Sequence, residues 1–98
     1  MFKHERYLRV AAGLTQKSIA EEAGVSITTV HHYEVGNNNI RPLTEKKVKE
    51  AYYELIRPER SDYTKIKLLA LAMQLREEGN RRKKKEIKNR IAELLELI

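Results

Sequence analysis

The chain has 98 residues, a length that supports one small core, and its lack of cysteine excludes disulfides and thiolate metal sites. Its three histidines lack carboxylate partners at metal-ligand spacing, and a formal net charge of +6 favours a polyanionic partner. Residues 1–9 are charged, unlike a signal peptide, and the longest apolar run covers only residues 68–73. We therefore expect a cytoplasmic protein without a metal or membrane partner.

Helical periodicity dominates the chain, and no stretch alternates between apolar and polar residues as a half-buried strand does. We therefore predict an all-α protein with about six helices. The first is predicted over residues 3–12 and stops at Gly13, because glycine adopts the left-handed conformation that ends helices. The second is predicted from Thr15, a favourable N-cap, to Gly24.

The third predicted helix contradicts local propensity. Residues 27–30 form a β-branched run that by itself favours a strand. Ser26 before this run is a favourable N-cap, and Gly36 after it is a favourable stop. These two signals predict a helix of about ten residues, and a turn of about three residues sets it at a steep angle to the second helix.

This third helix has two chemically different sides at about 100° per residue. The side that we expect to pack inward carries Val30, Tyr33 and Glu34. The side that we expect to face outward carries Thr28, His32 and Val35, flanked by Ile27 and His31. Hydroxyl, imidazole and methyl groups offer the donors, acceptors and apolar contacts that base edges in the DNA major groove require. The outer side is therefore a candidate DNA-reading surface.

A fourth helix is predicted after the Asn37 to Asn39 turn and Pro42, with Thr44 as its N-cap and an apolar stripe from Val48 to Ile56. Pro58 and the polar residues after it indicate a boundary between a domain of residues 1–57 and a helical hairpin of residues 58–98.

The hairpin is predicted to contain a fifth helix from Asp62 to Gly79 and a sixth over residues 84–97. The fifth has few polar faces, so we expect it to be enclosed on most sides and to bury its apolar surplus in a dimer. The predicted dimer contacts are Ile66, Leu69, Met73, Ile87, Ile91, Leu94, Leu95 and Ile98.

The basic run of residues 81–85 has two interpretations. Such a run is usually a solvated surface, but it also fits a phosphate or an acidic partner. Cations near a helix N-terminus oppose the macrodipole at a cost of a few tenths of a kcal/mol each, so a compensating use is conceivable.

Several positions at fixed spacing resemble one known family. They are Arg9, Gly13-Leu14-Thr15-Gln16, Ile19-Ala20, Ala23-Gly24-Val25-Ser26, Val30 and Tyr33-Glu34-Val35-Gly36-Asn37. Over about residues 5–55 the chain resembles the helix-turn-helix domain of the Cro and repressor family, also called the xenobiotic response element family. The resemblance implies a lambda-repressor-like domain whose third helix enters the major groove. It also implies a homodimer on a near-palindromic operator in double-stranded DNA, as in phage, plasmid or bacterial regulators.

The resemblance also implies roles for individual residues. Base contacts would come from Ile27, Thr28, His32 and His31, and backbone contacts from Gln16, Ser26 and Thr29. Arg9 and Glu34 would form a partly buried ion pair. The chain departs from the usual pattern because the third helix has no Lys or Arg, so the bidentate contact to guanine is missing. Candidate phosphate contacts beyond this helix are Asn38, Asn39 and Arg41.

Simpler interpretations stay open for several of these residues. The two adjacent histidines fit a solvated surface, and the three asparagines fit an ordinary turn. A second functional class is a protein-binding adaptor or antitoxin-like module that uses the hairpin, and a protein antagonist is a further candidate partner. No enzyme and no cofactor are expected, because the sequence has neither a glycine-rich phosphate loop nor a convergent catalytic set.

Overall fold

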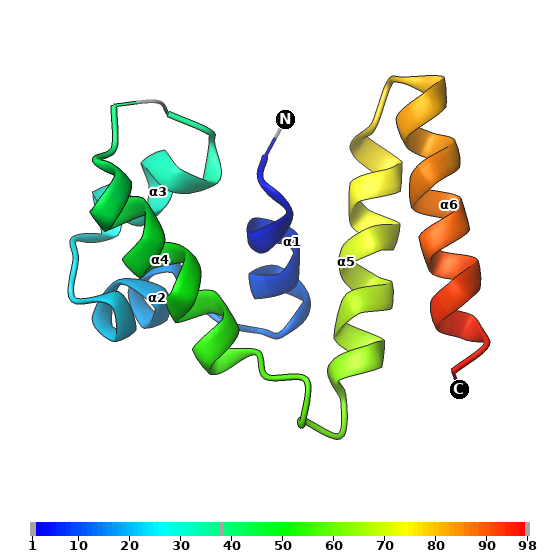
Figure 1. The fold of residues 1–98 in the computed structure, drawn as a ribbon, viewed down its shortest axis with the longest axis horizontal. Coiled ribbons are helices and arrows are strands. Elements are labelled where there is room, and N and C mark those ends of the chain that lie inside the picture. The colour runs from blue at the N-terminus through cyan, green and yellow to red at the C-terminus, as the bar shows by residue number, and fades with distance from the viewer. Residues whose placement is uncertain (1, 38, 98) are drawn as a thin grey trace.

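A computed structural model describes residues 2–37 and 39–97, and every regular element in these residues is an α-helix (Figure 1). The helices are α1 (His4–Ala11), α2 (Gln16–Ala23), α3 (Ile27–Glu34), α4 (Pro42–Leu55), α5 (Tyr63–Glu77) and α6 (Arg81–Leu95). The predicted all-α class is thereby confirmed. Two predicted site residues, Asn38 and Ile98, lie outside the described residues.

Side-chain caps and one left-handed glycine delimit α2 and α3, as the sequence predicts. The Thr15 Oγ1 atom accepts a hydrogen bond from the Ser18 amide at 3.1 Å. Gly24 then ends α2 with φ of 70°, a conformation that costs glycine little. The Ser26 Oγ atom accepts from the Thr29 amide at 3.2 Å, and only three residues separate α2 from α3.

The β-branched run forms the helix α3 because of the contacts that this helix makes. Val30 and Tyr33 are buried in one cluster with Ile19 of α2 and Val48 of α4. A β-branched residue in a helix costs less than about 0.7 kcal/mol relative to alanine, whereas burying a valine side chain stabilises by about 1.5–3 kcal/mol. Tertiary packing therefore outweighs the local preference for a strand.

The core consists of two clusters. The first joins α2, α3 and α4 through Ile19, Ala20, Val30, Tyr33, Val48, Ala51 and Tyr52. The second joins α1, α5 and the end of α4 through Tyr7, Leu8, Ile56, Ile66 and Ala70. Leu14 packs against both clusters and so connects them. Among the described residues, α6 contributes no member to either cluster.

The second cluster crosses the boundary that the sequence predicts after residue 57. Tyr7 and Ile56 lie before this boundary and Ile66 after it, yet all three share one core. The division into residues 1–57 and 58–98 therefore does not separate two cores, because α5 completes the packing of α1. Ile66 is only 3% exposed here, which does not fit its predicted place at a dimer interface.

Two helix starts differ from the prediction. α4 begins at Pro42 rather than after Thr44, because proline fits the first helical position, where no backbone N–H donor is needed. α6 begins at Arg81 rather than Lys84, because the Asn80 Oδ1 atom accepts from the amides of residues 82 and 83 at 2.9 and 3.1 Å. The cap formed by Asn80 lets α6 begin about one turn earlier than predicted.

The α5 helix is covered on two sides only. It packs mainly between α1 and α6, as Figure 1 shows, and its Leu69 side chain is 54% exposed. The single chain therefore leaves part of α5 exposed, and its expected enclosure in a dimer stays a prediction. In the described residues no helix is long and apolar enough to cross a bilayer.

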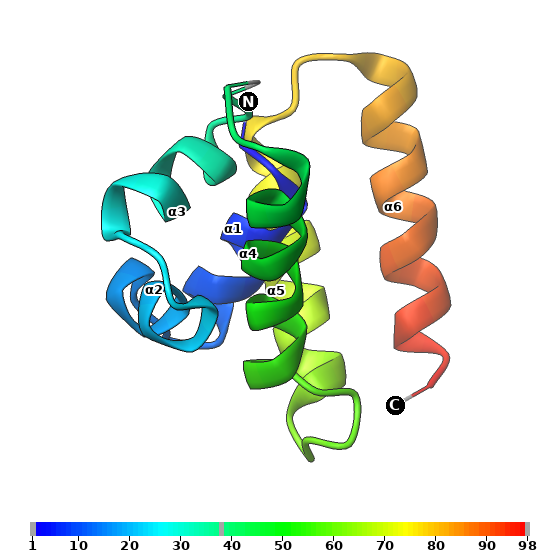
Figure 2. The same ribbon diagram turned by 60° about the vertical axis from the view of Figure 1, so that its left-hand side comes forward.

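The α3 and α6 helices lie at opposite edges of the molecule. Figure 2 shows α2 and α3 at one edge, α6 at the other, and α1, α4 and α5 between them. In Figure 1, α2, α3 and α4 overlap on one side, and α6 again lies at the opposite edge. Any partner that lies flat against α3 therefore leaves α6 on the far side.

Candidate nucleic-acid interface

The α3 helix has the two sides that its periodicity predicts. Val30, Tyr33 and Glu34 are buried. The opposite side is open to solvent and carries Ile27, Thr28, His31, His32 and Val35. This outer side offers hydroxyl, imidazole and aliphatic groups without any fixed charge, and within residues 2–37 and 39–97 no other element covers it.

A buried carboxylate fixes the position of α3. Glu34 is 1% exposed, and its Oε2 and Oε1 atoms accept from the Arg9 guanidinium at 2.7 and 3.0 Å. The same carboxylate accepts from the Tyr52 hydroxyl at 2.6 Å and from the Gln16 amide at 3.0 Å. One side chain of α3 is thereby joined to α1, α2 and α4, and the ion pair implied by the resemblance is present.

This network also sets the protonation of Glu34. Burial alone raises the pKa of the carboxyl group, but the hydrogen bonds from Arg9, Tyr52 and Gln16 outweigh burial and hold the pKa below its ordinary value. The pKa in the folded state is therefore lower than in the unfolded state. The stabilisation is present above the unfolded value of about 4.3 and is lost as the pH falls through the folded value.

A second buried carboxylate connects α3 to α1 and α4. Glu5 accepts from the Tyr33 hydroxyl at 3.1 Å and from the Tyr53 hydroxyl at 2.7 Å. Burial, reinforced by the Glu5 charge, raises the pKa of the Tyr33 hydroxyl. The Lys3 amide also donates to the backbone oxygen of Glu34 at 2.9 Å. The α3 helix is thus held from its inner side by polar contacts at several points.

Sequence reasoning did not find the polar roles of Glu5, Tyr52 and Tyr53. The available signal was the placement of Glu34 on an inward-facing side, because a buried carboxylate requires several donors. Arg9 supplies only part of that requirement, and Tyr52 on the buried side of α4 supplies a further donor.

The residues expected to touch the DNA backbone lie around the ends of α2 and α3. Gln16 stands at the start of α2, and its side-chain amide donates to Glu34. Ser26 and Thr29 stand at the start of α3 with their hydroxyl oxygens 2.9 Å apart. Ser26 and Thr29 thus stand where the outer side of α3 begins, whereas the side-chain amide of Gln16 bonds to Glu34 on the inner side.

The segment after α3 forms a turn. The Asn39 amide donates to the Asn37 Oδ1 atom at 2.8 Å, so Asn37 has the turn-forming role that the simpler interpretation gave it. Asn39 and Arg41 are exposed. They lie beyond the C-terminal end of α3 and remain candidate phosphate contacts.

The predicted dimer residues fall into two groups. Ile66 and Ile87 are 3% and 7% exposed, so they pack within the chain, whereas Leu69 and Leu95 are 54% and 56% exposed. The remaining described members, Met73, Ile91 and Leu94, are half-buried. Beside Leu69 runs a shallow groove lined by Ala72, Met73, Leu75 and Arg76.

Residues 6–51 match the model of a known family, described as helix-turn-helix. The match covers most of α1, all of α2 and α3, and most of α4, and so includes the whole outer side of α3. It also includes Arg9 and Gln16, which donate to the buried Glu34, whereas Glu5 and Tyr52 lie just outside it. Comparisons with curated proteins and with solved structures gave no match.

Proposed function

We propose that the protein is a dimeric transcriptional repressor that reads the major groove with α3. The support is the helix-turn-helix match over residues 6–51, since domains of this Cro and repressor type belong to DNA-binding regulators. The proposed operator is a near-palindromic duplex site of phage, plasmid or bacterial type. The protein performs no catalysis in this role. Release from DNA by a protein antagonist is compatible with it.

The observation that carries this proposal is the contrast between the two sides of α3. The inner side is fixed by two buried carboxylates, whereas Thr28, His31 and His32 on the outer side are exposed. A recognition helix must be held rigidly while its outer side chains stay free to contact base edges. We assign base contacts to Thr28 and His32, with Ile27 and His31 beside them.

The backbone contacts must compensate for the absence of Lys and Arg in α3. Ser26, Thr29 and Gln16 lie at helix starts, where backbone amides favour phosphate oxygens without a charged side chain. Asn39 and Arg41 are exposed beyond the other end of the helix. These groups set the register of the protein on the duplex, and the α3 side chains supply base preference.

We assign dimerisation to the exposed side of the α5–α6 hairpin. Leu69 of α5 is more than half exposed, and the groove beside it extends this apolar surface along α5. Leu95 of α6 is also more than half exposed. Met73, Ile91 and Leu94 border the interface in this proposal. A second copy would remove these aliphatic groups from water at about 25 cal/mol per Å² of apolar surface.

A second candidate function is a protein-binding adaptor or antitoxin-like module. The observation in its favour is that α3 has no basic side chain, while the hairpin exposes large aliphatic residues. In that case the hairpin would bind another protein, and the helix-turn-helix would contribute little to that binding.

In vitro selection of duplexes from a random pool separates these two functions. A dimeric regulator enriches sequences with two half-sites about 34 Å apart, one helical turn, or a multiple of that spacing. Binding of the recovered duplex should weaken as salt concentration rises. A pool that shows no enrichment after repeated rounds contradicts the regulator and favours the adaptor.

A further inference from the structure

The α6 region carries most of the net charge of the molecule. Residues 81–98 contain seven basic and three acidic groups, whereas residues 1–80 contain thirteen basic and eleven acidic groups. A charge of +4 out of the total of +6 therefore belongs to residues 81–98. The helix that is expected to bind DNA, α3, has no Lys or Arg. Charge and base-reading groups thus lie on different helices.

Part of this positive charge forms a ridge on the solvent side of α6. Ile87 faces α5 and is 7% exposed. At about 100° per residue, Arg82 and Lys85 point away from α5, with Arg81 and Lys88 beside them. All four are exposed, and among the described residues none of them forms an ion pair. We call Arg81, Arg82, Lys85 and Lys88 the outer ridge.

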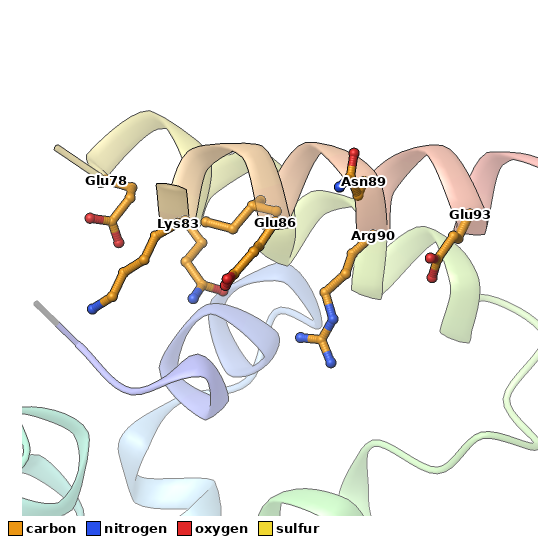
Figure 3. A pocket seen from close by; sticks show the side chains of 8 residues that line it. Glu78, Lys83, Glu86, Asn89, Arg90 and Glu93 are labelled. Atoms are coloured by element: carbon orange, nitrogen blue, oxygen red, sulfur yellow. The ribbon is translucent and has the colours of Figure 1, made fainter. Parts of the chain in front are cut away.

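A pocket between the end of α5 and α6 is different because its charges alternate in sign. Its lining residues are Gln74, Glu78, Lys83, Glu86, Ile87, Asn89, Arg90 and Glu93. Figure 3 shows Lys83 and Arg90 in this pocket together with the carboxylates of Glu78, Glu86 and Glu93. Opposite charges on one surface reduce its potential at a distance. The net positive charge of α6 therefore lies outside this pocket, on the outer ridge and on the half-buried Lys84.

The composition of the outer ridge favours a phosphate backbone over a protein surface. All four ridge side chains are cationic, whereas the centres of protein interfaces are rich in apolar and aromatic groups and poor in lysine. The exposed apolar Leu95 lies on the line of Arg81 and Lys88, two turns beyond the ridge at the other end of α6, so the proposed dimer contact borders the ridge without including it. A membrane surface is disfavoured because Ile87, Ile91 and Leu94, the apolar side of α6, face α5. The ridge spans about 10 Å, a length over which a DNA duplex presents about six phosphate charges.

The N-terminal amides of α6 do not provide the attraction. Asn80 already accepts hydrogen bonds from two of these amides, at 2.9 and 3.1 Å. The cations of the first turns also oppose the helix dipole, so their placement lowers the stability of the helix. A functional use explains why these cations lie in the first turns of α6 although they destabilise the helix.

We propose that the outer ridge binds the phosphate backbone of a second duplex, so that one molecule joins two DNA segments. In Figures 1 and 2 α6 lies at the opposite edge from α3, so a straight duplex on α3 does not reach the ridge. The ridge contact is independent of base sequence because it involves phosphates only. This inference rests on the proposed function, since α3 must hold the first duplex.

The test uses the full chain and two duplexes. A duplex recovered by selection is immobilised and saturated with protein, and capture of a fluorescent duplex of mixed sequence is then measured over a range of salt concentrations. The ridge variant replaces Arg82, Lys85 and Lys88 by glutamine. We expect its capture of the second duplex to fall at least tenfold, while its affinity for the first duplex changes less than about threefold. The salt slope of capture should fall by about 2 to 3 because three phosphate contacts are lost.

A matched control removes the same charge from another exposed helix face. Lys46, Lys47 and Lys49 of α4 are all exposed, and their replacement by glutamine should leave capture within about threefold of the wild type. Thermal unfolding verifies the fold of the ridge variant, whose midpoint should equal or exceed that of the wild type because cations near a helix N-terminus are removed.

Several results would overturn the inference. Equal capture by the ridge variant and the wild type would show that the ridge does not bind the second duplex. Equal loss of capture in the ridge variant and the α4 control would show that capture depends only on net charge. Loss of first-duplex binding in the ridge variant would place the ridge on the same duplex. Binding of polyglutamate but not of the second duplex would indicate an acidic protein partner. Failure of the wild type to bind even the selected duplex would contradict the proposed function instead.

Discussion

The α3 and α6 helices show two different ways to prepare a surface for DNA. α3 is short, has no Lys or Arg, and is fixed from its inner side by the buried carboxylates of Glu34 and Glu5. α6 is almost twice as long, carries seven cations, and contributes no described residue to either core cluster. Groups that must be placed accurately therefore lie where helices converge. Charged side chains need only exposure to solvent, and they lie on α6, the helix outside both core clusters.

The largest effect should come from removing the cation that pairs with Glu34. Arg9→Ala leaves a buried carboxylate without its charged partner, and breaking a buried ion pair in this way costs about 3–5 kcal/mol. The free energy of unfolding, measured by urea denaturation, should fall by this amount. DNA binding at the same temperature should fall in parallel with the folded fraction.

The control for Arg9 is an exposed ion pair in the same half of the molecule. Arg57 pairs with Glu54 on the surface of the chain, with both side chains more than half exposed. Arg57→Ala should lower the free energy of unfolding by less than about 1 kcal/mol, because exposed pairs contribute little. If the two variants lost the same stability, the account of α3 as a helix fixed by a buried pair would be wrong.

The next largest effect concerns the proposed dimer. Leu69→Glu introduces a charge into the exposed apolar side of the hairpin and should weaken dimerisation at least 100-fold, about 2.7 kcal/mol. Analytical ultracentrifugation over a range of concentrations measures this change. Leu43→Glu, at a more exposed leucine in α4, is the matched control and should leave dimerisation unchanged. A dimer that is insensitive to Leu69→Glu would have its interface elsewhere.

A smaller effect is expected on base preference. Thr28→Ala should reduce discrimination between the selected duplex and single-base variants by about 5- to 10-fold, since one base contact contributes about 1–1.5 kcal/mol. Gln16→Ala should instead weaken binding to all sequences alike, because Gln16 lies at the start of α2 and also positions Glu34. Competition binding with a panel of duplexes measures both. Equal weakening on every duplex by Thr28→Ala would remove Thr28 from the base contacts.

The smallest effect compares the N-caps of the two helices. Ser26→Ala removes the cap of a helix that belongs to the core and should lower the global free energy of unfolding by about 1 kcal/mol. Asn80→Ala removes the cap of α6 and should mainly increase hydrogen exchange at the first turn of that helix. If Asn80→Ala lowered global stability as much as Ser26→Ala, α6 would be part of the cooperative core.

Most of the fold follows from local signals in the sequence. Thr15, Gly24 and Ser26 predict the ends of α2 and α3 because capping depends on the residue and its immediate neighbours. The two sides of α3 follow from periodicity alone. The start of α6 was missed because Asn80 follows a glycine and precedes a basic run, which obscured its role as a cap.

The parts that could not be predicted depend on contacts between distant residues. Nothing local indicates that Glu5 accepts from Tyr33 and Tyr53, which lie 28 and 48 residues away. The packing of α5 on α1 likewise depends on which helices come together, so the sequence boundary at Pro58 did not reveal the shared core. The family resemblance, and not periodicity, supplied the Arg9 and Glu34 pair.

One nuclear magnetic resonance titration tests the central claim most directly. The isotope-labelled protein is titrated with the selected duplex while backbone and side-chain signals of α3 and α6 are followed. We predict that the signals of Ile27, Thr28 and His32 shift with the first equivalent of duplex, and that those of Arg82 and Lys85 shift only with excess duplex. Tight binding of the duplex with unchanged α3 signals would contradict the account.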